Sequence, residues 1–209
     1  MHIFLGRVRP LISLDCRSKP NVKHRYLERE FLSRSPNARI VLLRPSMCFM
    51  LLQTPDPLTL ASALPSFKYV SHIFLPVNDC SNPNMPEGGT HWSLLLVSVL
   101  DGVAFHYDSL FPLNSSEAEN ATTKLSILLR RELRFQELSD SPRQENGSDC
   151  GVFVCIQMRH LLLKKLLMAG SSEKISLSMG GKHVNAAQGR KEMLKTIEEF
   201  REKANKRRS

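Results

Sequence analysis

The segment Gln144-Glu-Asn-Gly-Ser-Asp-Cys-Gly-Val-Phe-Val places a single cysteine, Cys150, at the predicted start of a long apolar helix. Ser148 and Asp149 are suitable helix N-cap residues, and residues 151–168 are almost continuously apolar. The N–H groups and dipole of a helix N-terminus favour negative charge, so we expect the pKa of this thiol to lie below its ordinary value of about 8.5. A thiolate nucleophile is one interpretation, and an inert buried cysteine is the other.

The residues upstream of this helix predict a β-hairpin. Two strand-like runs flank Asp101-Gly102, a dipeptide typical of a tight turn. His91 opens the first run and Asp108 follows the second, so both lie at the same end of the hairpin. A thiol nucleophile needs a base, and the base needs a group that fixes its tautomer. His91, Asp108 and Cys150 could supply all three.

The register of this hairpin limits the catalytic interpretation. A two-residue turn at Asp101-Gly102 pairs Asp108 with Leu95, four residues from His91. That offset is roughly 13 Å at about 3.3 Å per residue, too far for a hydrogen bond. Because the offset is even, the two side chains still share one face of the sheet. A triad therefore requires a longer or shifted turn, or a bulge, that brings Asp108 opposite His91.

Three motifs, in this order, resemble the Ulp/SENP cysteine proteases that process ubiquitin-like modifiers. They are Gly88-Gly-Thr-His-Trp-Ser-Leu-Leu, Phe105-His-Tyr-Asp-Ser and Gln144-x-Asn-x-x-Asp-Cys-Gly. The similarity begins near Tyr26 and is greatest to the branch that acts on the Nedd/Rub modifier, the deneddylases. It implies a papain-like α+β fold of the Ulp type, with a mixed central sheet packed by helices and the nucleophile at a helix N-terminus.

The resemblance also implies roles for individual residues. His91 is expected as general base and acid, Asp108 as its orienting partner, and Cys150 as nucleophile. Gln144 matches the oxyanion-hole glutamine, which acts beside the backbone N–H of the cysteine. Trp92 matches a wall of a narrow channel that admits a Gly-Gly terminus, because glycine has no Cβ, although a core aromatic is the alternative. Further substrate contacts are expected from Gly88, Gly89, Asn146 and Asp149.

The expected activity is that of a cysteine peptidase or isopeptidase. It would cleave after the C-terminal Gly-Gly of a ubiquitin-like modifier, with the Nedd/Rub type ahead of SUMO and ubiquitin, in precursor processing or in deconjugation. A modifier-binding module with weakened catalysis stays open, because residues 1–24 lack the tryptophan motif that usually begins this family. Acyl transfer by the same cysteine and histidine is a third option. The expected partners are the modifier and its conjugates, and the expected state is a monomer.

Length and periodicity predict one protease domain over residues 25–209, with a basic C-terminal tail. Residues 1–24 form a divergent N-terminal segment, for which poor order is one option. Helices are expected at 25–32, 117–130, 152–168 and 189–206, and strands at 38–43, 72–77, 91–99, 103–107 and 133–138. Prolines between positions 55 and 86 are expected to break the middle of the chain into short elements and loops.

Composition limits the remaining classes of function. The net charge of +9 comes from the two ends of the chain, so we do not expect nucleic acid as a partner. The five cysteines include no CxxC pair and no zinc-site spacing, so no metal or other cofactor is expected. No apolar run is long enough to span a membrane, and no signal peptide is visible. We therefore expect a cytoplasmic or nuclear protein.

Overall fold

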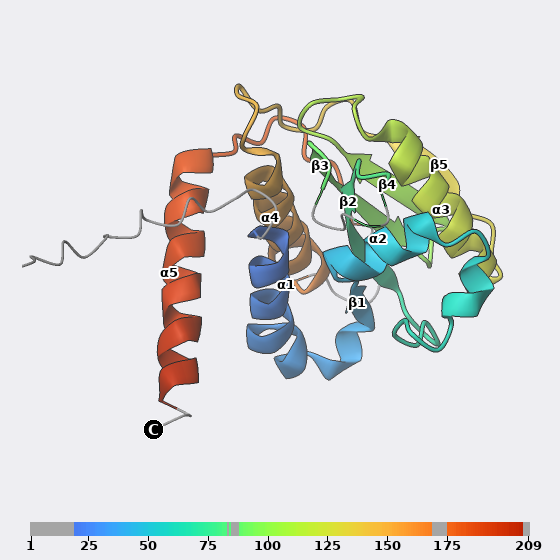
Figure 1. Ribbon diagram of the computed structural model, residues 1–209, viewed down its shortest axis with the longest axis horizontal. Coiled ribbons are helices and arrows are strands. Elements are labelled where there is room, and N and C mark those ends of the chain that lie inside the picture. The colour runs from blue at the N-terminus through green and yellow to red at the C-terminus, as the bar shows by residue number, and fades with distance from the viewer. Residues whose placement is uncertain (1–18, 83, 85–87, 169–174, 207–209) are drawn as a thin grey trace, which may run out of the picture.

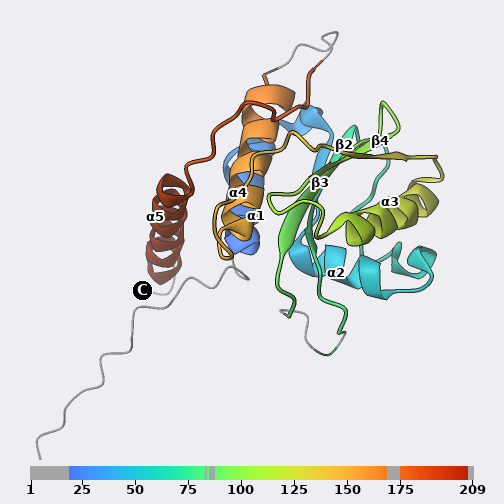
Figure 2. The same ribbon diagram turned by 90° about the horizontal axis from the view of Figure 1, so that it is seen from above.

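A five-stranded sheet forms the centre of the protein (Figures 1 and 2). The computed structural model describes residues 19–82, 84, 88–168 and 175–206. The strands are β1 (Ile40–Leu42), β2 (His72–Asn78), β3 (Trp92–Ser98), β4 (Val103–Tyr107) and β5 (Arg134–Glu137), in that spatial order. The pairs β2·β3 and β3·β4 are antiparallel, whereas β1·β2 and β4·β5 are parallel. The expected α+β fold with a mixed sheet is therefore confirmed.

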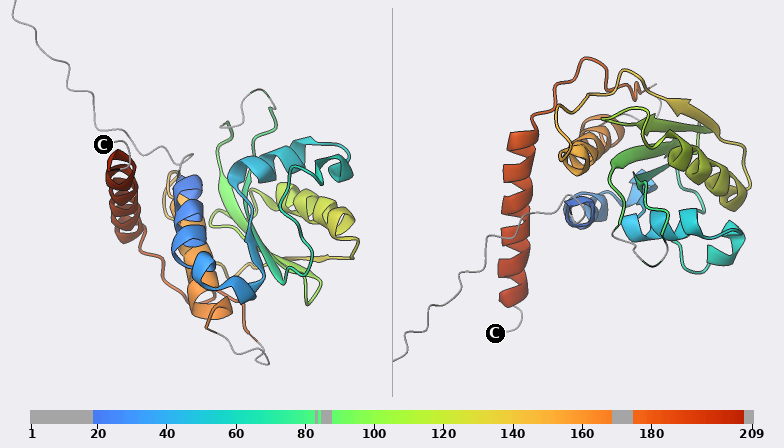
Figure 3. Two further views of the ribbon diagram at one scale, coloured as in Figure 1. Left: turned by 90° about the horizontal axis from the view of Figure 1, so that it is seen from below. Right: turned by 45° about the horizontal axis from the view of Figure 1, so that its top comes forward.

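Helices cover both faces of this sheet (Figure 2). One face carries α2 (Pro45–Gln53) and α3 (Ser115–Leu129), and the other carries α1 (Lys19–Glu30) and α4 (Cys150–His160). A final helix, α5 (Ala186–Asn205), packs on the outer side of α1 and α4 (Figure 3). In the part of the chain that the structure describes, no helix is both long enough and apolar enough to cross a membrane.

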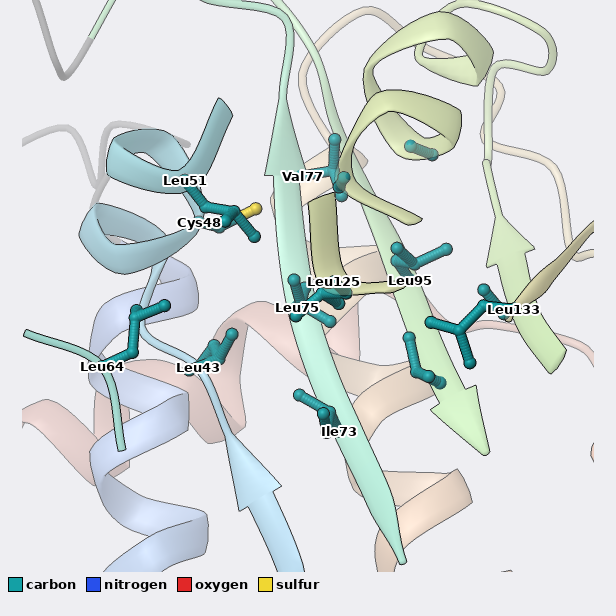
Figure 4. Packing of buried hydrophobic residues seen from close by; sticks show 14 of the residues in the cluster. Leu43, Cys48, Leu51, Leu64, Ile73, Leu75, Val77, Leu95, Leu125 and Leu133 are labelled. Carbon is teal, nitrogen blue, oxygen red and sulfur yellow. The ribbon is translucent and has the colours of Figure 1, made fainter. Parts of the chain in front are cut away.

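Alternating side chains divide the core into two apolar clusters, one on each face of the sheet. On β2, Ile73, Leu75 and Val77 point toward α2 and α3, as Figure 4 shows. Phe74, between them, points toward α4 with Trp92 of β3. Strand β3 is buried on both faces, which explains why its sequence is apolar almost without interruption.

The loop between β3 and β4 differs from the predicted two-residue turn. Leu94 pairs with Tyr107 and Ser98 with Val103, so residues 99–102 form a four-residue loop. The Ser98 hydroxyl donates to Asp101 Oδ2 at 2.5 Å, which ties the aspartate into the loop. Within this loop only Gly102, with a φ of +66°, adopts the left-handed conformation. The two-residue turn was therefore wrong.

Three of the four predicted helices differ from the observed helices mainly at their ends. Helix α1 begins at Lys19 instead of at residue 25. The helix predicted over 152–168 is confirmed over most of its length, with α-helical geometry as far as His160 and π-helical geometry over Leu161–Leu166. Helix α2 was not predicted. Its first residue is Pro45, a position that proline tolerates because the first N–H groups of a helix have no partner inside the helix.

Candidate active site

Cys150 is buried at the first position of α4. The preceding residue, Asp149, occupies the N-cap position, and its carbonyl oxygen accepts hydrogen bonds from the N–H groups of Val152 and Phe153 at 2.8 and 2.9 Å. Its side chain makes no capping hydrogen bond, so the predicted side-chain cap was wrong. The carboxylate instead accepts a hydrogen bond from Asn146 Nδ2 at 2.7 Å. The N-terminus of α4 thus keeps N–H groups free to face the sulfur.

The two other predicted triad residues meet at the end of the hairpin. His91 Nε2 and Asp108 Oδ1 are 2.6 Å apart, and both side chains are buried. Continued pairing places Asp108 opposite Ser93, two residues from His91. Diagonal neighbours on one face of a sheet lie within reach of long side chains, so direct opposition was not required. The shared face and the need for a longer turn were correctly predicted, although the loop moves the register only half of the way toward direct opposition of Asp108 and His91.

The environment favours ionisation of this group of residues. Burial alone would lower the pKa of His91, but hydrogen bonds with Asp108 and Cys150 and their negative charges raise it to about 9. Burial opposes ionisation of the Cys150 thiol, yet its hydrogen bond to His91 and the N–H groups of Trp92 and Gly151 lower its pKa below the ordinary value. The arrangement therefore supports a thiolate beside an imidazolium.

Asp108 is held as an anion by several donors. Burial disfavours its charge, but the hydrogen bond from His91 and the N–H groups of Leu110 and Asn114 lower its pKa. Those N–H groups lie 2.8 and 3.1 Å from the carboxylate oxygens. With Asp108 on Nε2, the buried Nδ1 of His91 is left as the ring nitrogen available to the Cys150 sulfur.

Gln144 is fixed at both ends of its amide. Its Oε1 accepts a hydrogen bond from the Ser109 hydroxyl at 2.6 Å, and its Nε2 donates to the Asn146 carbonyl oxygen at 2.5 Å. An amide NH₂ has two hydrogens, so one remains for an oxyanion. The sequence analysis missed Ser109, although it directly follows Asp108 in the second motif.

The segment before His91 is held by residues that the sequence analysis also missed. Asp79 accepts hydrogen bonds from the Thr90 hydroxyl at 2.6 Å, the Thr90 N–H at 2.7 Å and the His91 N–H at 2.9 Å. Asn78 Nδ2 donates to the His91 carbonyl oxygen at 2.8 Å. Asn78 and Asp79 could have been found from their position at the end of β2, because this end pairs with the start of β3, next to His91.

The predicted substrate contacts occupy different environments. Trp92 is almost fully buried in the same apolar cluster as Cys150. Gly88 and Gly89 are partly exposed, and Gly89 has a φ of +78°. A Cβ at Gly89 would lie 2.5 Å from Asn78 Oδ1, so only glycine fits there. Exposed Asn146 and buried Asp149 lie in the loop that leads to α4.

Comparisons with known proteins bear on the family of this chain. Residues 21–171 match the model of the Ulp1 protease family, C-terminal catalytic domain. NEDD8-specific protease 2 of Schizosaccharomyces pombe is 38% identical over 173 residues, which cover 81% of this chain and 41% of that protein. Probable sentrin-specific protease 8 of Dictyostelium discoideum is 31% identical over 151 residues, covering 68% of this chain and 61% of that protein. The chain thus spans less than two thirds of the length of either relative.

A solved structure has a similar fold. The Xanthomonas campestris effector protein XopD bound to ubiquitin superposes with a TM-score of 0.59 at 21% identity, covering 91% of this chain and 95% of that chain. At this identity the likeness concerns the fold alone. The family model, in contrast, covers most of the chain, including every residue of the site described above. The chain therefore belongs to the Ulp1 protease family.

Proposed function

We propose that this protein is a cysteine peptidase that cleaves after the C-terminal Gly-Gly of a ubiquitin-like modifier. The observation that carries the proposal is the 2.6 Å contact between His91 Nε2 and Asp108 Oδ1, beside a Cys150 thiol of lowered pKa. The names of the relatives favour a NEDD8-type modifier, with the SUMO type next. Its partners would be the modifier and its precursors or conjugates.

The mechanism follows from the charges of the triad. The Cys150 thiolate attacks the carbonyl carbon of the terminal glycine, and a tetrahedral oxyanion forms. The oxyanion accepts hydrogen bonds from the free hydrogen of Gln144 Nε2 and from the Cys150 N–H. His91, as imidazolium, donates its proton to the leaving amine and breaks the C–N bond. His91 then takes a proton from water, whose oxygen displaces the sulfur and releases the modifier.

Substrate binding is proposed for residues around this centre. Trp92 borders the cysteine and would form one wall of the channel for the Gly-Gly segment. Gly88 and Gly89 would line the entrance, and a side chain at Gly89 would collide with Asn78 and Asp79. Asn146 is exposed and would contact the modifier at the loop. Asp149 offers little surface, because it is only 6% exposed.

Turnover of a fluorogenic modifier tests the activity. We expect a NEDD8-type modifier with a C-terminal aminocoumarin amide to be hydrolysed, and we expect Cys150→Ala to abolish hydrolysis. Cys155→Ala is the matched control, since Cys155 is buried in the same helix. Cys155→Ala should retain activity within about threefold, because it removes only the Sγ atom of a residue away from the triad. Equal loss in both variants would contradict the assignment of Cys150 as the nucleophile.

The alternatives predict different results. A modifier-binding module would bind the modifier without hydrolysing its amide. An acyltransferase would become acetylated at Cys150 by acetyl-CoA, and this product is visible as a mass increase. Either result, from folded protein, would replace the peptidase proposal.

A further inference from the structure

Helix α5 reaches the active site although it lies beyond the residues that the family model matches. It runs beside α1 and α4, on the side away from the sheet (Figures 1 and 3). Arg190, in its second turn, forms an ion pair with the carboxylate of Asp149. Arg190 Nη2 also donates to the carbonyl oxygen and the hydroxyl of Ser148, both at 3.3 Å. One guanidinium therefore contacts the two residues that directly precede Cys150.

The packing of α5 on α4 fixes the position of Arg190. A Cβ at Gly189 would lie 2.6 Å from Ile156 Cδ1 and 3.0 Å from Val152 Cγ1, so the absent side chain permits close contact. Met193, one turn later, is buried against Val152. The guanidinium thus approaches the start of α4 from an anchored helix.

The charge of Asp149 makes this contact relevant to catalysis. The thiolate of Cys150 and the oxyanion are both negative, and a neighbouring carboxylate opposes both. The charged groups near Cys150 are His91, with Asp108 on its ring and Asp79 on its N–H, Asp149 at the N-cap of α4, and Arg190 on α5. Asn146 also donates a hydrogen bond to Asp149, but its amide is neutral. Arg190 is therefore the group that balances the negative charge of Asp149.

We propose that Arg190 is a positioning residue that neutralises Asp149 and holds the loop before Cys150, so that α5 controls the reactivity of the nucleophile. This inference rests on the proposed function only for its effect on turnover. The charge balance itself concerns the free protein.

The first test measures the thiol in the absence of any modifier. The full chain is alkylated with iodoacetamide between pH 5 and 10, and the rate at Cys150 is read by peptide mass spectrometry. Arg190→Gln should move the midpoint of the rate profile to higher pH, because an unbalanced carboxylate disfavours the thiolate. Adding Asp149→Asn should return the midpoint to the wild-type pH or below. An unchanged midpoint in Arg190→Gln, or no return in the double variant, would overturn the proposal.

Two further variants separate charge from docking. Arg159 Nη1 donates to Glu192 Oε2 at 2.8 Å, which is a second ion pair between α4 and α5, on the surface. Arg159→Ala loosens the same helix contact without changing the charge at Asp149, so its midpoint should match the wild type. Arg190→Lys keeps the charge but loses the guanidinium fork, so its midpoint should lie closer to wild type than that of Arg190→Gln. Equal shifts in Arg159→Ala and Arg190→Gln would refute the charge mechanism, even if Arg190→Gln were poorly folded.

Modifier turnover distinguishes this inference from the proposed function. At pH 7 we expect Arg190→Gln to lower kcat/KM about tenfold, and Asp149→Asn to recover most of that loss. If the alkylation midpoints shift as predicted but no modifier is cleaved, the proposed function fails and the charge balance stands. If modifiers are cleaved while all midpoints coincide, the role of Arg190 fails and the proposed function stands.

Discussion

The hydrogen bond between His91 and Asp108 favours the charged form of His91, which is the general acid of the proposed mechanism. Asp108 fixes one ring nitrogen and its negative charge helps to raise the pKa of His91 to about 9. The imidazolium must be present to protonate the leaving amine, and the thiolate must be present to attack. We therefore expect kcat/KM to fall at alkaline pH with a midpoint near the pKa of His91.

Asp108→Asn tests this dependence. Removing the carboxylate charge lowers the pKa of His91, so the alkaline limb of the pH–rate profile should move to lower pH. Turnover at pH 7 should fall by about 10²- to 10⁴-fold, as expected when the orienting carboxylate of a triad is lost. Asp101→Asn, at the other end of the same hairpin, is the control and should leave the limb in place. A limb that stays near pH 9 in Asp108→Asn would contradict the assigned role.

In the proposed mechanism, Ser109 acts on the oxyanion through Gln144. Its hydroxyl donates to Gln144 Oε1, which keeps Nε2 directed away from Ser109. We expect Ser109→Ala to lower kcat about tenfold with little change in KM, and Gln144→Ala to raise the barrier by about 3 kcal/mol. In a double-mutant cycle, Ser109→Ala should add little to Gln144→Ala, because both changes remove the same donor. Additive losses would place Ser109 in a separate role.

At the scale of elements, the connection from β2 to β3 positions His91. Asp79 accepts three hydrogen bonds from Thr90 and His91. Burial alone would raise the pKa of Asp79, but these hydrogen bonds lower it below its ordinary value. Asp79→Ala should reduce the free energy of unfolding by about 2 kcal/mol and kcat/KM about tenfold. Asp56 is a suitable control, because it accepts a hydrogen bond from the Leu58 N–H at a distant surface helix. Urea unfolding and turnover should show a stability loss without a catalytic loss in Asp56→Ala.

The strands could be predicted from the sequence, because apolar runs bounded by turn residues are a local signal. The contact between His91 and Asp108 could be anticipated as well, since both residues lie at the same end of the hairpin. The register could not be predicted, since an Asp-Gly turn signal is compatible with loops of different length and the observed loop spans residues 99–102. Arg190 could not be recognised either. Its partner, Asp149, is 41 residues earlier, and only the packing of α5 on α4 brings them together.

At the scale of the whole molecule, two buried histidines make stability depend on pH. Burial, with the charge of Arg44 as a smaller cause, lowers the pKa of His24 from 6.5 to about 4, and burial lowers that of His106 to about 4. Between these values the unfolded chain binds protons that the folded chain does not, so stability decreases as pH falls from 6.5 to 4. Each histidine contributes up to about 3 kcal/mol to this loss.

Urea unfolding between pH 7 and 4.5 measures the effect. His24→Gln should show a shallower decrease than the wild type, whatever its stability at pH 7. His183→Gln, at an exposed position, should follow the wild-type slope. The change in the free energy of unfolding with pH is the informative quantity in this range. His91 does not affect it there, because its pKa is raised and its contribution to stability is lost between pH 6.5 and about 9. Identical slopes for His24→Gln and the wild type would contradict the assignment.

Covalent trapping of the nucleophile tests whether Cys150 attacks the C-terminus of a modifier. The full chain and Cys150→Ala are incubated with C-terminal propargyl derivatives of a NEDD8-type modifier, SUMO and ubiquitin, and intact mass is measured. We predict one adduct, with the NEDD8-type probe, that maps to Cys150 as a vinyl thioether and is absent from the variant. Folded wild-type protein that forms no adduct with any probe, or an adduct that persists in Cys150→Ala, would contradict the assignment of Cys150 as the nucleophile of a modifier peptidase.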